Sequence, residues 1–459
     1  MRRAGVVCHV TSLPTAAGAG PLGGQAHAFV DFLASAGLSI WQVLPLNPPD
    51  SHGSPYQSTS LSACSAALAD WSEVAAAGGL AAWLRRREDR FAAFCAEQAF
   101  WLDDFALFSI AEREMAAPWW RWPGPLRNRD PEALAAFSRG HAQAIEGIRA
   151  QQFVVHEHWH RVRRAANARD VVLLGDMPLY PALASADVWA NRTFFQLDAE
   201  GRPVAVAGVP PDYFSATGQL WGNPLYDWDE IAADGFRWWL ARLGAQLALF
   251  DVVRIDHFRG LEAYWSVPAG ARDATGGRWC PAPGVRLLEA VHARFPALPL
   301  VAEDLGIITP EVDALRDAFA LPGMRVLQFA FSGDPDNPHL PEHYAPRTLA
   351  YTGTHDNDTT LGWYGSLDPA TRATVDRYLG GAPAMPWSMI ERVLASRANA
   401  ALAPLQDFLE LDGRARMNTP GIAEGNWRWR FAADALTPTL AARIRRAVEA
   451  SGRQPTGSS

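Results

Sequence analysis

The chain has 459 residues and a formal net charge of −8, with acidic and basic side chains interspersed along its length. Because no stripe of basic residues is present, we exclude nucleic acid as a partner. All 41 basic residues are arginine, which excludes Schiff-base catalysis, lysine-anchored pyridoxal phosphate and a lysine-dependent phosphate-binding loop.

The cysteines and the apolar stretches limit the compartment and the metal chemistry. Cys8, Cys64, Cys95 and Cys280 lie far apart without metal-ligand spacing, which argues against a zinc site and against a disulfide framework. No stretch is long and apolar enough to span a bilayer, and the amino terminus lacks the pattern of a signal peptide. We therefore expect a reduced, cytoplasmic protein with no membrane partner. The 19 tryptophans favour carbohydrate as a ligand class, although core packing explains most of them.

The amino-terminal third predicts a βαβ unit followed by an insertion. Strands are expected at 5–10 and 40–44, with a helix at 26–36 between them. The loop at 47–60 is rich in Pro, Ser and Gly and contains Tyr56, just beyond a strand end where binding loops occur. From 61 to 169 the pattern is helical, and we interpret the Trp cluster at 119–122 as the hydrophobic anchor of this insertion.

The middle of the chain returns to buried strands. A strand from 171 ends at Asp176, and a long irregular stretch at 189–228 follows, which predicts an active-site loop region. A helix at 236–249 leads into the strand at 251–255. Alternation along that strand places Arg254 and Asp256 on one face, where a guanidinium is expected to lower the pKa of the carboxyl group. An ionised carboxylate of this kind can act as a nucleophile, and a structural Arg–Asp pair is the alternative.

Further strands are expected at 298–302, at 325–329 and at 349–351, with a weak eighth candidate at 415–418. Glu303 follows the first of these strands, and His355 and Asp356 follow the third. Eight strands with helices between them favour an α/β chain folded as a (β/α)8 TIM barrel over a doubly wound sheet. We expect one catalytic domain over 1–450, without a carboxy-terminal β-sandwich, and a disordered tail at 451–459.

Three carboxylates follow separate strands, and the sequence contains no metal-binding histidine cluster beside them. Asp256 and Glu303 are about one βα unit apart, and Asp356 follows about two units later. In a barrel these side chains converge at one mouth, where one can attack an anomeric carbon and another can protonate the leaving oxygen. The third would then stabilise the charge that develops on the sugar ring. This constellation indicates glycosyl transfer without a metal or a cofactor.

The sequence resembles the 4-alpha-glucanotransferases (amylomaltases and disproportionating enzymes) of glycoside hydrolase family 77, in the α-amylase clan. The resemblance covers nearly the whole chain and rests on several motifs together. These are Thr-Ser-Leu-Pro at 11–14, Ser-Pro-Tyr-Gln at 54–57, Gly-Asp-Met-Pro at 175–178, Pro-Asp-Tyr-Phe at 211–214, Trp-Gly-Asn-Pro-Leu-Tyr at 221–226, Arg-Ile-Asp-His-Phe-Arg-Gly at 254–260, Glu-Asp-Leu-Gly at 303–306, Thr-His-Asp-Asn-Asp at 354–358 and Asn-Thr-Pro-Gly at 418–421.

The resemblance implies a retaining transferase that moves α-1,4-glucan segments from maltooligosaccharide donors to an acceptor, including glucose. It implies that Asp256 is the nucleophile, Glu303 the general acid/base and Asp356 the transition-state stabiliser. The substrate-binding residues that it implies are Arg254 and His355 at the reactive subsite, Asp176 after the third strand, Tyr56 and Trp221 as acceptor- and donor-site aromatics, and Gln219 in a flexible loop near the cleft.

Some motifs depart from the family pattern, at 18–21, at 61–67, at Ala184 and at 279–284. These changes fall in loops at the mouth and at the insertion junction, so they bear on subsites and chain-length preference rather than on the chemistry. The residues alone leave two other functions possible. A glucan hydrolase would share the three carboxylates, and a non-catalytic glucan-binding relative would be expected to have lost at least one of them.

Overall fold

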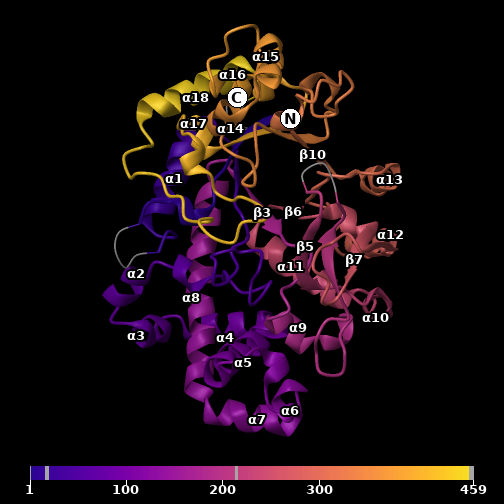
Figure 1. Cartoon of the computed structure of the whole chain (residues 1–459). Helices are drawn as coiled ribbons and strands as arrows, with labels where there is room; N and C mark the ends of the chain where they lie inside the picture. The colour runs from indigo at the N-terminus through magenta and orange to yellow at the C-terminus, as the bar shows by residue number, and fades with distance from the viewer. Residues whose placement is uncertain (1, 16–19, 212–214, 454–459) are drawn as a thin grey trace.

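The computed structural model describes residues 2–15, 20–211 and 215–453 (Figure 1). Eight parallel strands form one sheet in the order β10-β11-β12-β1-β2-β3-β6-β9. The amide of Ala302 donates to the carbonyl of Pro322 across the remaining gap between β9 and β10, at 2.9 Å, so the sheet nearly closes into a barrel. The predicted barrel is confirmed. Its strands are β1 (Arg3–Val7), β2 (Ile40–Gln42), β3 (Val172–Met177), β6 (Val252–Ile255), β9 (Leu300–Ala302), β10 (Gly323–Val326), β11 (Thr348–Tyr351) and β12 (Ala400–Pro404).

Alternation along the strands builds the barrel interior and positions the site. One set of positions points inward and forms an apolar cluster to which all eight strands contribute. Leu174 in β3 and Val252 in β6 belong to this cluster, so Asp176 and Arg254, two residues further on, point the same way. The interior is therefore apolar at its base and ionised towards the carboxyl ends of the strands.

The outward positions of the strands pack against helices. Leu173 and Val253, for example, belong to the large core cluster that also contains apolar residues of the surrounding helices. These helices include α1 (Gly24–Ser35), α11 (Arg237–Leu249), α12 (Gly284–Arg294), α13 (Pro310–Ala318), α16 (Trp387–Ala395) and α18 (Pro438–Ala450). Shorter helices are α9 (Ala186–Ala190), α10 (Trp228–Ala233), α14 (Thr360–Ser366), α15 (Pro369–Tyr378) and α17 (Leu405–Phe408). None of the helices in the described ranges is long and apolar enough to cross a membrane.

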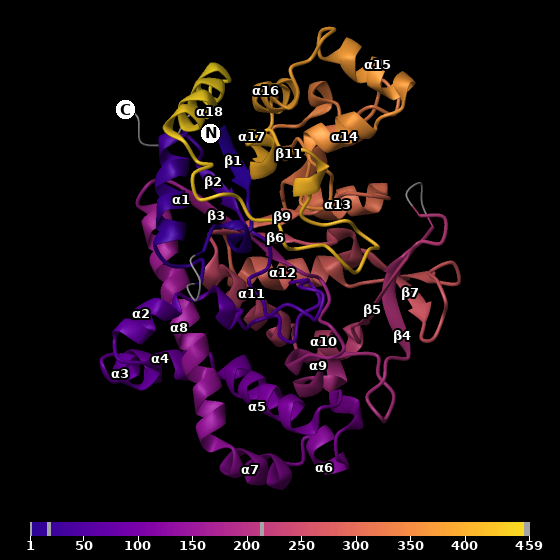
Figure 2. The ribbon, with the colours of Figure 1, turned by 60° about the vertical axis from the view of Figure 1, so that its left-hand side comes forward.

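Seven helices connect β2 to β3; α2 to α7 gather at one end of the molecule, and the long helix α8 runs from there back to the barrel (Figures 1 and 2). Trp119 and Trp122 are buried there, and the Trp119 indole donates to the carbonyl of Leu183. The ring of Trp122 packs edge-on against Trp189 at 5.5 Å. The interpretation of the Trp cluster as a hydrophobic anchor is confirmed. The seven helices are α2 (Trp71–Ala76), α3 (Leu80–Arg85), α4 (Glu88–Glu97), α5 (Ala99–Met115), α6 (Gly124–Arg127), α7 (Pro131–Gly140) and α8 (Ala142–Asn167).

A second, antiparallel sheet stands beside the barrel mouth, in the order β5-β4-β7-β8 (Figure 2). Two of its strands lie within 189–228, so the expectation of a purely irregular loop region there is wrong. β4 pairs with its neighbour β5 and also with β7, which occurs later in the chain, and local sequence does not reveal such pairing. Residues 212–214 of the Pro-Asp-Tyr-Phe motif lie outside the described residues. The strands are β4 (Ala205–Val209), β5 (Gln219–Pro224), β7 (Ala263–Pro268) and β8 (Arg278–Pro281).

Two expectations near the carboxyl terminus are wrong. Residues 415–418 form no strand; the eighth strand is β12, whose alanine-rich sequence is typical of helices but is buried at all five positions. The tail was expected to be disordered from 451. Arg453 is instead fully buried and donates to the carbonyl groups of Arg3, Leu394 and Ser396, which fastens the chain end to the start of β1. Residues 454–459 lie outside the described residues.

Candidate active site

The carboxyl ends of four barrel strands supply the ionisable groups that the sequence analysis selected. Asp176 is the penultimate residue of β3, and Asp256 follows β6 directly. Glu303 follows β9, and Asp356 lies five residues after the end of β11. Backbone hydrogen bonds between neighbouring strands continue past these ends, from Asp256 to Met177 at 3.0 Å and from Glu303 to Ile255 at 3.1 Å. The hydrogen bonds of the barrel therefore fix the backbone positions of Asp256 and Glu303.

Arg254 joins two of the carboxylates. Its Nη1 lies 2.6 and 2.7 Å from the two carboxylate oxygens of Asp176 and 3.0 Å from Oδ1 of Asp256. The side chains of Arg254 and Asp176 are 5% and 0% exposed. A buried guanidinium shared by two acids holds both in fixed orientations, and burial without such pairing would be very costly. The predicted proximity of Arg254 and Asp256 is confirmed.

The pKa of Asp256 departs from expectation. Burial raises it to about 6, and the negative charges of Asp176 and Asp356 add to the increase, while Arg254 opposes it. Arg254 lowers the pKa as expected, but desolvation outweighs this attraction, so the expected net lowering is wrong. A group with this pKa is mostly ionised at pH 7. Asp256 thus keeps the charge that a nucleophile needs.

Glu303 is only 9% exposed, and its pKa is raised to about 8, first by burial and then by the neighbouring charge of Asp256. Two backbone amides oppose this rise, since His257 N–H donates to Oε2 at 2.7 Å and Leu305 N–H donates to Oε1 at 3.0 Å. The carboxyl group is therefore held in place at both oxygens and is mostly protonated at pH 7. Such a group can deliver a proton to a leaving oxygen.

The backbone at His257 makes the contact with Glu303 possible. His257 adopts a left-handed conformation with φ of +50°, which costs a residue other than glycine roughly 1–2 kcal/mol. This conformation ends β6 and aims the amide of His257 at the Glu303 carboxyl group. Burial lowers the pKa of the His257 imidazole to about 3, so the ring is neutral. Backbone strain at this point therefore accompanies the positioning of Glu303.

Tyr56 and His355 lie beside the cluster of carboxylates. The Tyr56 hydroxyl donates to Oδ2 of Asp176 at 2.8 Å and lies 3.0 Å from Nε2 of His355. Since the only hydroxyl proton serves Asp176, His355 must donate to Tyr56 through a protonated Nε2. The same Nε2 lies 3.3 Å from Oδ1 of Asp356, and the Tyr56 and His355 rings stack at 5.4 Å. Tyr56 thus belongs to the network that surrounds Asp256.

Gln219 and Trp221 lie in β5 of the small sheet, not in a loop. The indole of Trp221 donates to the side-chain oxygen of Gln219 at 3.1 Å. The Trp221 ring packs edge-on against His257 at 4.7 Å, which brings this strand next to the backbone that holds Glu303. The structure therefore brings Trp221 and, through it, Gln219 to the carboxylate site from the side of the second sheet.

Three residues in the segment after β12 complete the site and were not selected from the sequence. Asn418 donates from Nδ2 to Oδ1 of Asp356 at 2.6 Å, and Arg416 donates to the backbone carbonyl of Asp356 at 2.5 Å. Trp427 packs on Tyr56 at 5.7 Å and near His355 at 6.0 Å. The Asn-Thr-Pro-Gly motif marks Asn418 in the sequence, whereas no local pattern distinguishes Trp427 from the other tryptophans.

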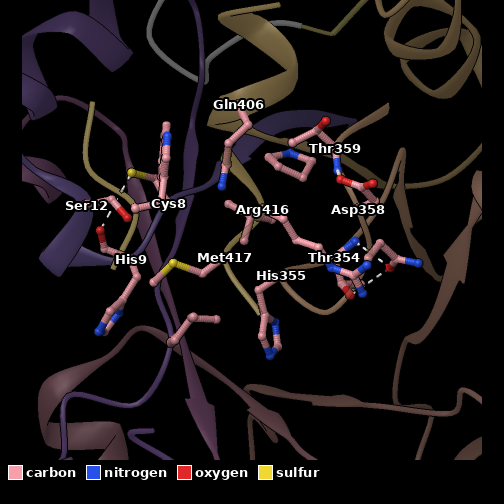
Figure 3. Close-up of a pocket in the computed structure, with 15 residues that line it drawn as sticks. Cys8, His9, Ser12, Thr354, His355, Asp358, Thr359, Gln406, Arg416 and Met417 are labelled. Carbon is pink, nitrogen blue, oxygen red and sulfur yellow. Dashed lines mark hydrogen bonds between the residues drawn. The ribbon is translucent and has the colours of Figure 1, made fainter. Parts of the chain in front are cut away.

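A small cavity lies behind His355, between the carboxyl ends of β1, β2, β11 and β12 (Figure 3). It offers about 20 Å3 of water-accessible space, enough for a single water molecule and far too little for a sugar. His9 lines it and is 7% exposed, and its Nδ1 has no hydrogen-bond partner within the described residues. The cavity is therefore a structural feature beneath the site rather than a substrate pocket.

Known proteins were compared with the chain. The profile of the family described as 4-alpha-glucanotransferase, glycoside hydrolase family 77, matches residues 8–89 and 81–436. A 4-alpha-glucanotransferase of Thermus thermophilus is 43% identical over 495 aligned residues, which cover 98% of this chain and 99% of that protein. The chain belongs to glycoside hydrolase family 77.

Other members of family 77 agree with this assignment. A chloroplastic/amyloplastic 4-alpha-glucanotransferase of Arabidopsis thaliana is 40% identical over 94% of this chain and 81% of that one. The amylomaltase of Streptococcus agalactiae, solved in complex with acarbose, superposes with a TM-score of 0.95 at 31% identity, covering 99% of this chain and all of that one. As a family 77 member the chain is an enzyme, a 4-alpha-glucanotransferase, and the resemblance seen in its motifs is confirmed.

One departure from the family motifs, the segment at 61–67, packs away from the carboxylates. The backbone amide and carbonyl of Cys64 are both hydrogen bonded by the side chain of Gln152 on α8, at 2.9 and 2.8 Å. The amide of Leu61 donates to Asp187 at 2.9 Å. This altered segment joins the barrel to the helices between β2 and β3. Of the segment at 18–21, residues 18 and 19 lie outside the described residues.

Proposed function

We propose that this enzyme transfers α-1,4-glucan segments by a retaining, two-step mechanism with Asp256 as nucleophile and Glu303 as general acid/base. The observation that carries the proposal is that Asp256 and Glu303 follow the paired strands β6 and β9, with Asp256 held by Arg254 and Glu303 held at both oxygens by backbone amides. The pKa values of Asp256 and Glu303, about 6 and about 8, leave one carboxyl group charged and the other protonated near pH 7. A retaining glycosidase needs this division of roles.

In the first step an Asp256 carboxylate oxygen attacks C1 of a glucose unit in the donor. The bond from C1 to the bridging oxygen breaks as that oxygen takes the proton of Glu303, and the released segment leaves with a free 4-hydroxyl. The product is a β-linked glycosyl ester on Asp256. Two backbone amides then stabilise the newly ionised Glu303, since each donates to one of its oxygens.

In the second step the 4-hydroxyl of an acceptor attacks C1 and gives its proton to Glu303. The ester bond to Asp256 breaks, and a new α-1,4 linkage forms with the original configuration. We propose glucose and maltooligosaccharides as acceptors, and no cofactor takes part. Water in the acceptor's place would give hydrolysis, so transfer requires that the acceptor be positioned far better than water.

We propose supporting roles for the neighbouring residues. Asp356, oriented by Asn418, holds hydroxyl groups of the reacting sugar, and its 44% exposed side chain leaves it accessible to the substrate. Tyr56, Asp176, Arg254 and His355 form the wall around the same sugar, a revision of the acceptor-site role expected for Tyr56, because its hydroxyl contacts Asp176 and His355. Gln219 and Trp221 contact the glucan from the small sheet.

Two further proposals concern the whole chain. We propose that residues 1–450 act as one catalytic domain, supported by the packing of α8, the last helix between β2 and β3, against the barrel helix α1. We also propose that the enzyme works in a reducing compartment, the cytoplasm. The support is that Cys8, Cys64, Cys95 and Cys280 are all free thiols.

The residue roles are tested with donors that differ in leaving group. Glu303→Gln should spare the first step, in which the leaving group departs, much more with α-glucosyl fluoride than with maltotriose, since fluoride leaves with little proton assistance. Asp256→Asn should lose activity with both donors, because each needs the covalent ester. The measurement is the initial burst of fluoride release beside the initial burst of glucose release from maltotriose, each of which reports the first step.

The control for folding is Asp251→Asn, which changes a carboxylate at the opposite, amino-terminal side of β6 that hydrogen bonds Arg163 and Asn167. It should keep the ratio between the two donors unchanged. Equal losses of Glu303→Gln with fluoride and maltotriose would remove Glu303 from the acid role. An Asp256→Asn enzyme that keeps a tenth of wild-type turnover would rule out Asp256 as the nucleophile.

A further inference from the structure

The segment that follows β9 supports the Glu303 carboxyl group, yet it has no regular structure. Residues 303–309 form neither a strand nor a helix. Leu305 lies in this segment, and its amide donates to Oε1 of Glu303 at 3.0 Å. The hydrogen bonds of a strand or a helix therefore do not hold this donor in place. The residues that fasten the segment also determine where the Glu303 carboxyl group lies.

Asp304 fastens the segment to β10. Its side chain is fully buried, and Oδ1 accepts a hydrogen bond from the amide of Met324 in β10 at 2.6 Å. Oδ2 accepts from Arg316 at 2.5 Å and from Arg325 at 3.1 Å. Gly323 makes room for this carboxylate, because a side-chain carbon there would lie 2.4 Å from Oδ2. Asp304 thus joins the end of β9 to β10, at the place where these two strands are not neighbours in the sheet.

Arg259 fastens the same segment on its other side. Its guanidinium donates from Nη1 to the backbone carbonyl of Ile307. Arg259 is only 6% exposed, and the guanidinium lies 3.7 Å from the centre of the Trp279 ring, which packs over it. The ion pair of Arg259 with Glu262 is loose, at 3.9 Å. Within the described residues, the Ile307 carbonyl is therefore the closest polar partner of this side chain.

Arg259 belongs to the same turn after β6 as His257. The amide of His257 donates to Oε2 of Glu303, and the amide of Phe258 donates to the backbone carbonyl of Glu303 at 3.1 Å. Arg259 thus links the turn that holds one carboxyl oxygen to the segment whose Leu305 amide holds the other. Without this link the two amides could move independently, and the carboxyl group would lose its fixed orientation.

We propose that Arg259 and Asp304 are positioning residues for the general acid, because together they hold the Leu305 amide against Glu303. The inference rests on the proposed function, since it takes Glu303 as the acid. Both side chains act through Glu303 and not on the sugar. Misplacing a reacting group by about 1 Å can cost roughly a hundredfold in rate. The loss should therefore fall on donors whose leaving group needs the proton.

The consequence is an effect that depends on the leaving group. Arg259→Met removes the donor to the Ile307 carbonyl and keeps an apolar side chain beneath Trp279. It should slow the first step about tenfold with maltotriose but less than about twofold with α-glucosyl fluoride, because fluoride leaves with little proton assistance. Arg259→Lys keeps a cationic donor at this position, so its first step with maltotriose should be faster than that of Arg259→Met.

Asp304→Asn separates the effect of position from the effect of charge. It weakens the contacts with Arg316 and Arg325, and it removes a negative charge where Arg259→Met removes a positive one. A displaced acid should raise the donor ratio, which is the burst rate with fluoride divided by that with maltotriose, in both variants. Charge alone would raise the pKa of Glu303 in Arg259→Met and lower it in Asp304→Asn, so the two ratios would change in opposite directions.

The experiment measures the initial bursts of fluoride release and of glucose release from maltotriose, using the full chain at pH 7. Arg254 and Asp256, whose charges affect the pKa of Glu303, are unchanged in every variant. The matched control is Arg453→Met, because Arg453 is also buried and donates to backbone carbonyls, but at the amino-terminal side of the barrel. This control should lower the midpoint of thermal unfolding and leave the donor ratio unchanged.

The outcomes separate this inference from the proposed function. A raised donor ratio in both Arg259→Met and Asp304→Asn, with recovery in Arg259→Lys, supports the inference. An unchanged ratio in Arg259→Met overturns it, as do equal losses with both donors or opposite changes of the ratio in the two variants. If Asp304→Asn does not fold, the two Arg259 variants decide by the same criteria. Equal losses of Glu303→Gln with both donors would instead contradict the proposed function itself.

Discussion

Arg254 shows how one residue sets the chemistry of several others. It neutralises part of the charge of Asp176 and Asp256, yet burial still raises the pKa of Asp256 to about 6 and that of Glu303 to about 8. The two carboxyl groups lie in the same environment, but the pKa of Asp256 is below 7 and the pKa of Glu303 is above 7. The guanidinium touches Asp256 directly, whereas the pKa of Glu303 is raised by burial and by the charge of Asp256 against the opposing effect of Arg254 and two backbone amides.

The pH dependence of catalysis follows from these two values. Activity should rise with pH as Asp256 loses its proton near pH 6 and fall as Glu303 loses its proton near pH 8. We expect a bell-shaped profile of kcat/KM on maltotriose with a maximum near pH 7. Glu303→Gln, assayed on α-glucosyl fluoride, should lose the alkaline limb and keep the acid limb. An alkaline limb that persists in this variant would assign it to another group.

Tyr56 carries a second prediction at this scale. Burial and the charge of Asp176 raise the pKa of Tyr56 well above its usual range, so the hydroxyl remains a donor to Asp176. Tyr56→Phe leaves that carboxylate short of one hydrogen bond and should lower kcat on maltotriose about tenfold to a hundredfold. The control is Tyr378→Phe, which removes a similar bond to Glu342 outside the site. Equal kcat values for the two variants would exclude Tyr56 from the reactive subsite.

The sequence identified the acidic residues of the site but not their protonation states. Their positions after predicted strands indicated Asp256, Glu303 and Asp356. The alternation of side chains along the strand indicated that Arg254 and Asp256 share a face. The direction of the Asp256 pKa shift was wrong because it depends on how deeply the barrel buries the group, which adjacent residues do not encode. Asn418 and Trp427 reach the site from a segment that forms neither a strand nor a helix at these positions, and the weak strand pattern at 415–418 was misleading.

At the scale of elements, β3 depends on close packing at Gly175. A side-chain carbon at this position would lie 2.1 Å from the ring of Phe250, which is buried beside β6. Gly175→Ala should destabilise the protein by about 1–3 kcal/mol through overpacking and should displace Asp176, the next residue. Activity and the midpoint of thermal unfolding should therefore fall together.

Gly147 provides the matched control for that substitution. It lies inside α8, and nothing is within 4 Å of an added side-chain carbon. Gly147→Ala should stabilise the protein by about 0.5–1 kcal/mol through helix propensity alone, without changing activity. A neutral Gly175→Ala variant would mean that Phe250 can move aside, and that β3 is held less tightly than its packing indicates.

Elements were predictable from sequence where their periodicity was local and strong. The strand before Asp256 and the helix at 236–249, observed as α11, both have apolar patterns that decide between strand and helix. The strand β12 was missed because its alanines favour a helix and only the closed barrel selects an extended chain there. The small sheet was missed because β4 finds its partners β5 and β7 through tertiary structure.

At the scale of the molecule, the two ends of the chain meet where the barrel begins. Arg2 donates to the carbonyl of Ser451, and Arg453 donates to the carbonyl of Arg3. Both views place α18, which Ser451 follows, away from the helices α2 to α7 (Figures 1 and 2). The overall barrel was predictable from a count of strands. The contact between the two terminal segments was not, because it depends on the buried Arg453 in a segment whose polar composition indicated a disordered tail.

The measurement that tests the central proposal most directly is a count of reducing ends during the reaction with maltotriose. Transfer conserves reducing ends while it releases glucose and forms longer oligosaccharides, whereas hydrolysis adds one reducing end at each turnover. We predict that glucose accumulates while the total of reducing ends stays nearly constant, because the acceptor sugar outcompetes water for the glycosyl ester on Asp256. A new reducing end at nearly every turnover would contradict the transferase and establish a hydrolase.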